Sequence, residues 1–166
     1  VENKICGATD IALTDRGHEQ AITTGEELVR QGVHIDKILY SPLIRAAETA
    51  RHISEITGVP RQAEPRLTEQ CFGKWESTPR DGADFREAKK QFVERHEGGE
   101  SMLHLAQRIY NLLDDVCAHA DTVYLLVAHN GIARVVQSYF HDMTNEEYAA
   151  FGVKNCEIVR YDFPEK

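Results

Sequence analysis

The chain has 166 residues, of which 42% are hydrophobic, and its formal net charge is −8. This length and hydrophobic content predict one domain over residues 1–166 with a full core, and no Pro-, Gly- or Ser-rich stretch marks a linker. The acidic balance argues against nucleic acid and membranes as partners, because both are polyanionic and favour a basic surface.

Helix and strand signals alternate along the chain. Helices are predicted where a capping residue precedes apolar residues spaced three or four apart, and strands where short apolar runs lie between turn residues. The predicted helices span about 14–31, 42–58, 81–96, 101–120, 132–140 and 145–151, the predicted strands span 36–40, 122–129 and 157–162, and residues 59–67 are extended. This alternation predicts an α/β fold, a three-layer α/β/α sandwich with a mainly parallel sheet.

Specific residues predict the ends of the first two helices. Thr14 is the expected N-cap of the first helix and Gly32 its C-cap. Ser41 as N-cap, with Pro42 at the first helical position, predicts the start of the second helix, which should end at Gly58.

The segment after residue 67 is polar and rich in reactive side chains. Residues 68–79 (TEQCFGKWESTP) are predicted to form a loop, and residues 81–96 a polar helix with a basic side, followed by Gly98 and Gly99. We expect a small helical lid around residues 77–100.

His129 comes directly after a short apolar run, residues 123–128, of the kind found in a strand that is covered on both faces. Asn130 and Gly131 give a tight exit into a helix, so the imidazole is expected beside a helix N-terminus, where backbone N–H groups attract phosphate. Open α/β sheets also bind ligands outside the carboxyl ends of their strands. The alternative is that His129 is only a polar residue that ends a strand.

Arg45 is the second candidate, because it lies in the first turn of a predicted helix and helical side chains lean toward the N-terminus. A forked, always-charged guanidinium at that position suits the binding of a phosphoryl group. The alternative is a surface arginine that pairs with Glu48, three residues further on.

Glu69 is the third candidate, in the loop beside Phe72 and Trp75. A carboxyl group that is partly buried near aromatic rings has a raised pKa and can donate a proton at neutral pH. Glu76 is an equally acidic competitor in the same loop.

The remaining histidines and the cysteines carry no metal-site pattern. None of the seven other histidines forms an HxH or HExxH arrangement, so they are interpreted as structural or exposed: His18, His34, His52, His96, His104, His119 and His141. The four cysteines are scattered without a CxxC pair, which fits free thiols in a reducing cytosol. No apolar run reaches membrane-spanning length, and we expect a cytoplasmic protein without metal or other cofactor.

Four sequence blocks come one after another along nearly the whole chain: GATDIALTDRGHEQA at 7–21, SPLIRAAETA at 41–50, LTEQCFGKWE at 67–76 and VAHNG at 127–131. Together they resemble the histidine phosphatase superfamily, also called phosphoglycerate-mutase-like. Four blocks in order are much more specific than any one of them alone.

The resemblance implies a covalent mechanism. A histidine attacks a phosphomonoester, a glutamate protonates the leaving oxygen, and water then hydrolyses the phosphohistidine. By position, Arg45 matches the family's second arginine, Glu69 its proton donor and His129 the second histidine of the phosphate pocket.

The resemblance also implies further substrate contacts at Cys6, Gly7 and Asn130. Cys6 and Gly7 fall where mutase relatives place a Thr-Gly contact, and the cysteine departs from that pattern. Asn130 stands where the family usually has glycine. Its backbone N–H is expected to face the phosphate and its side chain to narrow the mouth of the pocket.

The family's nucleophile belongs to an Arg-His-Gly motif at the end of the first, central strand, and residues 1–166 contain no such motif. The first four residues resemble the segment that the family has just after that strand. We therefore expect the strand and its nucleophile upstream of Val1, and residues 1–166 alone to be inactive. A chain that evolved without the motif is the alternative.

The leading functional prediction is a phosphomonoester hydrolase that acts on a small phosphorylated metabolite, because the CFGKWE turn at 71–76 looks like the phosphatase branch. The enzyme alternative is a 2,3-bisphosphoglycerate-dependent phosphoglycerate mutase. The alternative of another class is a catalytically inactive phosphate-binding or scaffolding module. A homodimer is compatible with the sequence, and neither nucleic acid nor membrane is expected as a partner.

Overall fold

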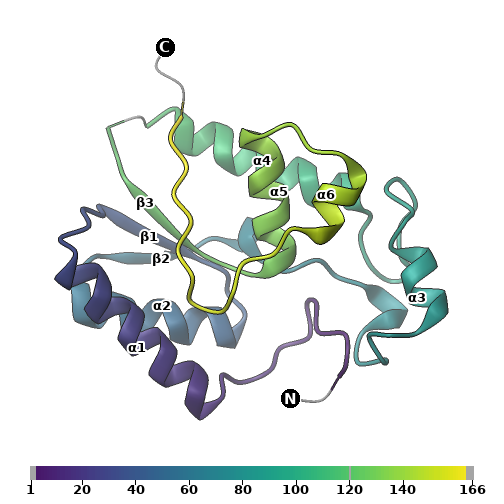
Figure 1. The fold of residues 1–166 in the computed structure, drawn as a ribbon, viewed down its shortest axis with the longest axis horizontal. Coiled ribbons are helices and arrows are strands. Elements are labelled where there is room, and N and C mark those ends of the chain that lie inside the picture. The colour runs from purple at the N-terminus through teal and green to yellow at the C-terminus, as the bar shows by residue number, and fades with distance from the viewer. Residues whose placement is uncertain (1–2, 120, 164–166) are drawn as a thin grey trace.

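A parallel sheet lies between two layers of helices in the computed structural model, which describes residues 3–119 and 121–163 (Figure 1). Within the described residues the sheet has three strands in the order β2-β1-β3. They are β1 (Lys37–Tyr40), β2 (Arg61–Ala63) and β3 (Tyr124–Val127), and β1 pairs in parallel with both neighbours. The predicted α/β fold with a parallel sheet is confirmed.

The helices cover both faces of the sheet. One layer consists of α1 (Asp15–Arg30) and α2 (Ile44–Thr57), and the other of α4 (Met102–Cys117) and α5 (Asn130–Phe140) (Figure 1). The shorter helices are α3 (Ala83–Ala88) and α6 (Asn145–Ala150), with single 3-10 turns at Pro65–Leu67 and Gly73–Trp75. Among the described residues, none of the helices has the length and apolar character needed to cross a bilayer.

Alternation along β1 divides the core in two. Ile38 packs with buried residues of α1 and α2, whereas its neighbour Leu39 packs with those of α4 and α5. Successive strand residues point to opposite faces, so one short strand anchors both helical layers. Burial of each such side chain contributes roughly 1.5–3 kcal/mol to folding.

The predicted caps are right at two of four positions. The Thr14 hydroxyl accepts a hydrogen bond from the Gly17 N–H at 3.1 Å, and Gly58 is the C-cap of α2 with a left-handed φ of 73°. Gln31 is the C-cap of α1, and Gly32, with a left-handed φ of 63°, follows it. Ser41, however, does not cap α2, which begins at Ile44.

Ser41 instead extends the sheet. Its N–H donates to the carbonyl of Val127 at 2.9 Å, which continues the β1–β3 pairing past Tyr40. At the start of α2, the Asp10 carboxylate accepts a hydrogen bond from the Ile44 N–H at 2.8 Å, the kind of bond that Ser41 was expected to provide.

The predicted helix over 81–96 is wrong in length, because only α3, over Ala83–Ala88, forms. A polar segment with little apolar periodicity gains little from helix formation. Phe85 and His96 instead pack against Phe72, with ring centroids 5.3 and 5.6 Å from it. The role of residues 77–100 as a lid stays a prediction.

The predicted strand over 157–162 does not form. A strand needs an edge with which to exchange backbone hydrogen bonds, and alternation alone does not supply one. Tyr161 stacks on Phe140 at 4.8 Å between ring centroids and donates its hydroxyl to the Gln137 side chain at 2.6 Å. The segment is thus held on α5 by side chains.

Candidate active site

The carboxyl ends of β1 and β3 lie at the same edge of the sheet, and the predicted residues gather there. Ser41 comes directly after β1, and His129 lies two residues after the end of β3. The His129 Nε2 and the Ser41 Oγ are 2.7 Å apart and share a hydrogen bond. This edge is where open α/β sheets bind ligands.

His129 is the N-cap residue of α5, as the sequence predicted from the tight exit at Asn130 and Gly131. Its backbone is extended, with φ −136° and ψ 167°, and its side chain makes no capping bond, so the imidazole is left for the site. Burial, together with the positive charges of Arg45 and Arg108, lowers the pKa of His129 to about 3. The ring is therefore neutral at physiological pH when no anion is bound.

Glu69 is buried beside the first turn of α5, with 8% of its surface exposed. Its carboxylate accepts from the Gln70 N–H at 2.9 Å and from the Gly131 N–H at 3.0 Å. Burial raises the pKa of Glu69, and it outweighs the opposing effects of these two N–H groups and of Arg45 and Arg108. A carboxyl group in this setting holds its proton to higher pH than an exposed one.

Arg45 points toward the loop at residues 7–9. Its guanidinium donates to the carbonyls of Gly7 at 2.8 Å and Thr9 at 2.9 Å. The alternative pairing with Glu48 is not formed, because Glu48 binds Arg51 at 2.9 Å. Arg45 therefore holds the loop at residues 7–9 in place, and its contact with a phosphoryl group stays a prediction.

Glu76, the competing carboxylate, is fully engaged. It accepts from the Thr9 hydroxyl and from the N–H groups of Gly7 at 3.0 Å, Ala8 at 3.1 Å and Phe72 at 2.9 Å. Burial opposes its ionisation, but these hydrogen bonds outweigh burial and lower the pKa of Glu76. Glu76 is thus an ionised carboxylate that shapes the loop, and Glu69 is the better proton donor.

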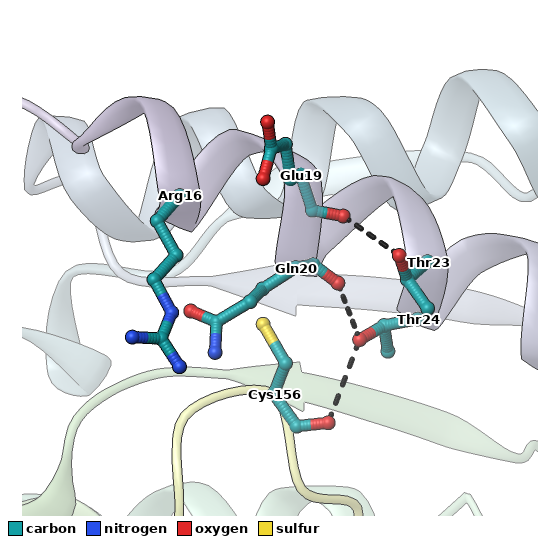
Figure 2. A pocket seen from close by; sticks show the side chains of 6 residues that line it. All are labelled: Arg16, Glu19, Gln20, Thr23, Thr24 and Cys156. Carbon is teal, nitrogen blue, oxygen red and sulfur yellow. Dashed lines mark hydrogen bonds between the residues drawn. The ribbon is translucent and has the colours of Figure 1, made fainter.

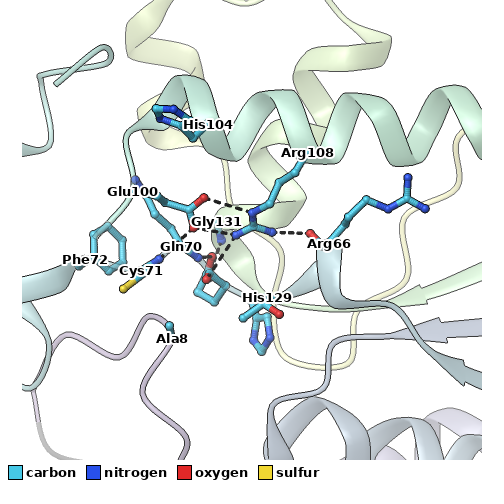
Figure 3. Close-up of polar contacts among 12 residues, drawn as sticks. Ala8, Arg66, Gln70, Cys71, Phe72, Glu100, His104, Arg108, His129 and Gly131 are labelled. Carbon is cyan, nitrogen blue, oxygen red and sulfur yellow. Dashed lines mark hydrogen bonds and ion pairs between the residues drawn. The ribbon is translucent and has the colours of Figure 1, made fainter. Parts of the chain in front are cut away.

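Arg108 of α4 was not among the residues predicted from the sequence, and Figure 3 shows it reaching from α4 toward Glu100. Arg108 forms a two-point ion pair with Glu100, at 2.9 and 3.1 Å, and also donates to the backbone carbonyls of Arg66 and, at 3.5 Å, Glu69. The available signal was its position between Leu105, Ile109 and Leu112 on the buried face of α4. An arginine at such a position needs buried partners.

A second group of cations stands near Glu69. The pKa of Lys89 is lowered by burial of its ammonium group and by the charges of Arg134 and Arg80, while Glu69 acts in the opposite direction. Lys89 comes directly after α3, and Arg134 lies on α5. The otherwise acidic chain therefore concentrates positive charge around this carboxyl group.

The three further predicted contacts differ in their surroundings. The Cys6 thiol donates weakly to the Thr9 carbonyl at 3.5 Å. Gly7 lies so close to the Gln70 carbonyl that an added Cβ would overlap it. The Asn130 side chain accepts from the Val153 N–H at 3.0 Å and is held against the segment after α6. Their contacts with substrate stay predictions.

A hollow lies between α1 and Cys156 (Figure 2). The residues that line it are Arg16, Glu19, Gln20, Thr23, Thr24 and Cys156. The two threonine hydroxyls are already bound to backbone carbonyls within α1, at 2.9 and 2.8 Å. None of the predicted site residues lines this hollow, so the sheet edge is the stronger candidate.

Comparison with known proteins agrees with this geometry. The family model of the histidine phosphatase superfamily (branch 1) matches residues 1–166. A protein named probable phosphoglycerate mutase GpmB, from Yersinia pestis (strain Pestoides F), is 31% identical over 171 residues, which cover 98% of this chain and 78% of that protein.

Two solved structures share the fold. A mycobacterial glucosyl-3-phosphoglycerate phosphatase superposes with a TM-score of 0.78 at 25% identity, over 93% of this chain and 81% of that one. A putative alpha-ribazole-5'-P phosphatase from Escherichia coli superposes with a TM-score of 0.79 at 26% identity, over 93% and 79% of the two chains. Both structures carry phosphatase names, whereas the sequence relative carries a mutase name.

Proposed function

This chain belongs to the histidine phosphatase superfamily (branch 1), and from that premise we propose that it hydrolyses a small phosphomonoester metabolite in the cytosol. The observation that carries the proposal is a buried Glu69 with a raised pKa, close enough to Arg45 for their charges to interact. His129, whose own pKa responds to Arg45, stands at the same edge of the sheet. A proton donor and a cationic pocket at one site are what phosphoryl transfer to a histidine requires.

The proposed reaction has two steps, and Glu69 takes part in both. A histidine nitrogen attacks phosphorus, and the bond from phosphorus to the ester oxygen breaks while Glu69 donates its proton to that oxygen. Arg45 and His129 hold the phosphoryl oxygens as negative charge shifts between them. Water then attacks the phosphohistidine, the ionised Glu69 takes its proton, and inorganic phosphate leaves.

The attacking histidine, in this proposal, is that of the family's Arg-His-Gly motif, which residues 1–166 do not contain. Its strand would pair with β3, because β1 occupies only one edge of β3 and the described residues place no strand on the other. Such a pairing would bring the end of that strand beside His129. The form to assay is therefore the protein together with any segment encoded ahead of Val1.

A mutase function competes with the phosphatase function. The phosphatase names of both structural neighbours favour hydrolysis, and the name of the Yersinia relative favours transfer. The decisive assay supplies 3-phosphoglycerate with 2,3-bisphosphoglycerate, and also a panel of simple phosphomonoesters. We expect release of inorganic phosphate. Formation of 2-phosphoglycerate without free phosphate would establish the mutase, and no turnover of any kind would leave a phosphate-binding module.

Substitution of Glu69 tests the proposed proton donor. We expect Glu69→Gln to abolish most turnover of alkyl phosphates, whose leaving alkoxide needs a proton, and to spare much of the activity on p-nitrophenyl phosphate, whose phenolate leaves unaided. The loss on alkyl phosphates should reach about a hundredfold or more. Equal losses on both substrates would show that Glu69 only positions other groups.

A further inference from the structure

His18, Glu48 and His52 meet where α1 packs against α2. Each offers one ligand atom, and the three atoms all lie within 4.8 Å of one another. Glu48 and His52 are one turn apart on α2, and His18 reaches them from the first turn of α1. Glu48 and His52 lie about one and two helical turns after Arg45. Arg45 bonds to the loop at residues 7–9 and not to the cluster.

The two imidazoles are arranged around a shared point. His18 Nδ1 and His52 Nε2 are 2.8 Å apart, and the rings meet edge to face at an angle of 86°. One of the two nitrogens must carry the proton of this hydrogen bond, while the other accepts it. A cation that replaced this proton would find both lone pairs directed toward it.

The donor set of the cluster suits a metal. It offers two imidazole nitrogens and one carboxylate, and neutral imidazole and ionised carboxylate are the forms that bind metal ions.

We propose that His18, Glu48 and His52 bind a divalent transition-metal ion of the zinc class, which clamps α1 onto α2. Two histidines and a glutamate are a known zinc ligand set, whereas calcium and magnesium prefer oxygen ligands throughout. Zinc–nitrogen bonds of about 2.0–2.1 Å in a tetrahedral site place two nitrogens about 3.3 Å apart. The rings therefore need to separate by about 0.5 Å, and water completes the coordination.

Arg51 is the internal competitor for this site. It binds Glu48 at 2.9 Å and lies 3.4 Å from His52 Nε2, so its charge opposes a cation there. It also binds Glu55 at 2.9 Å, and this second pair can hold the guanidinium when Glu48 turns to the metal. Removal of the Arg51 side chain should therefore strengthen metal binding.

The sequence pattern did not predict this site. The sequence predicted no metal-ligating residues, and this proposal differs from that prediction. The search for HxH and HExxH motifs looks within one segment, whereas these ligands come from two helices that are far apart in the sequence. On α2 alone, the pattern is only a glutamate with a histidine four residues later.

The test is a titration of the purified chain with Zn²⁺ by calorimetry, and with Co²⁺ followed by its visible absorption. We expect one saturable site without the cobalt–thiolate charge-transfer band, which excludes the four cysteines as ligands. Both His18→Gln and His52→Gln should weaken binding by at least about tenfold, and Arg51→Ala should tighten it. Zn²⁺ should raise the melting temperature of the wild type and not that of the histidine variants.

His34→Gln is the matched control, because His34 is an exposed histidine that pairs with Asp36 at 3.0 Å, outside the cluster. Its affinity for Zn²⁺ should equal that of the wild type. Melting curves recorded without metal verify that each variant is folded. The proposal is overturned if the wild type shows no saturable binding, or if the folded His18→Gln and His52→Gln variants bind as tightly as the wild type.

Discussion

Glu69 and Glu76 are seven residues apart in one loop, yet their surroundings give them opposite protonation preferences. Burial dominates at Glu69 and raises its pKa, whereas hydrogen bonds from loop 7–9 and Phe72 dominate at Glu76 and lower its pKa. The sequence could place both carboxylates near aromatic residues. It could not show which one is saturated with donors, because most of those donors come from residues almost seventy positions away.

We predict that Glu69→Gln raises the free energy of unfolding at neutral pH, although it lowers activity. A raised pKa in the folded state means that stability is lost as the pH rises through that pKa, and glutamine removes this loss. The gain should shrink on acidification, as Glu69 becomes protonated first in the folded state and then in the unfolded state. Urea unfolding at pH 7 and at pH 4.5 measures the gain at each pH.

Glu76→Gln is the matched comparison for that prediction. It removes charged acceptors from the N–H groups of loop 7–9, which should cost about 1.5–3 kcal/mol of stability at neutral pH. If the Glu69 variant were destabilised to the same extent, both carboxylates would be structural.

His129 should take up a proton when an anion binds. Burial and two arginines lower its pKa to about 3 in the structure, and an anion beside the ring favours the imidazolium and raises that pKa. Sulfate is the suitable probe, because it does not titrate between pH 5 and pH 7. Calorimetry in buffers of different ionisation enthalpy should show proton uptake in the wild type and none in His129→Asn. Equal uptake in both proteins would assign the proton to another group.

At the scale of elements, the first turn of α5 connects the helix to the proton donor. Its Gly131 N–H donates to Glu69, and an added Cβ at Gly131 would overlap the Glu69 carboxylate, with the carboxyl carbon at 3.0 Å. Gly131→Ala should therefore displace Glu69 and lower turnover of alkyl phosphates at least about tenfold, with a smaller loss on p-nitrophenyl phosphate.

Gly82→Ala is the control, since its added Cβ would make only an ordinary contact of 3.5 Å with the Pro79 carbonyl. It replaces a glycine by alanine beside α3 without touching Glu69, so activity should be retained. Unchanged activity in Gly131→Ala would indicate that Glu69 can move aside for the added methyl group. The short distance between Gly131 and Glu69 would then have no role in catalysis.

Sequence signals predicted the ends of helices well where neighbouring residues determine them. Thr14 caps the start of α1 and Gly58 caps the end of α2 as expected, because capping depends on neighbouring backbone groups. The predicted secondary structure was wrong where residues distant in the sequence determine it. Ser41 continues the register of the β1–β3 pair, and the segment at 157–162 lacks a strand partner within the described residues.

At the scale of the whole molecule, the parallel sheet brings residues that are far apart in the sequence to one edge. The residues just after β1 and β3 are nearly ninety positions apart, and pairing of the two strands brings Ser41 and His129 within 2.7 Å. The strand-end rule predicted His129, the first-turn position predicted Arg45, and the loop beside aromatic residues predicted Glu69. The structure places Arg45 close enough to both other residues to influence their pKa values, and their role in a site stays a prediction. The His18–His52 pair could not be predicted, because its contact arises from packing between two helices and leaves no local pattern. Arg108 left only its position on the buried face of α4, which does not identify its partners.

The central claim is that Arg45, Glu69 and His129 form a phosphate pocket at this edge of the sheet. The most direct test is titration of the chain with inorganic phosphate by calorimetry. We predict one site per chain and a loss of at least about tenfold in affinity for Arg45→Ala, since a charged donor contributes about 1.5–3 kcal/mol. Arg51→Ala, also on α2 but paired with Glu48 and Glu55, should bind phosphate as the wild type does. Equal affinity of the wild type and Arg45→Ala for phosphate would contradict this claim.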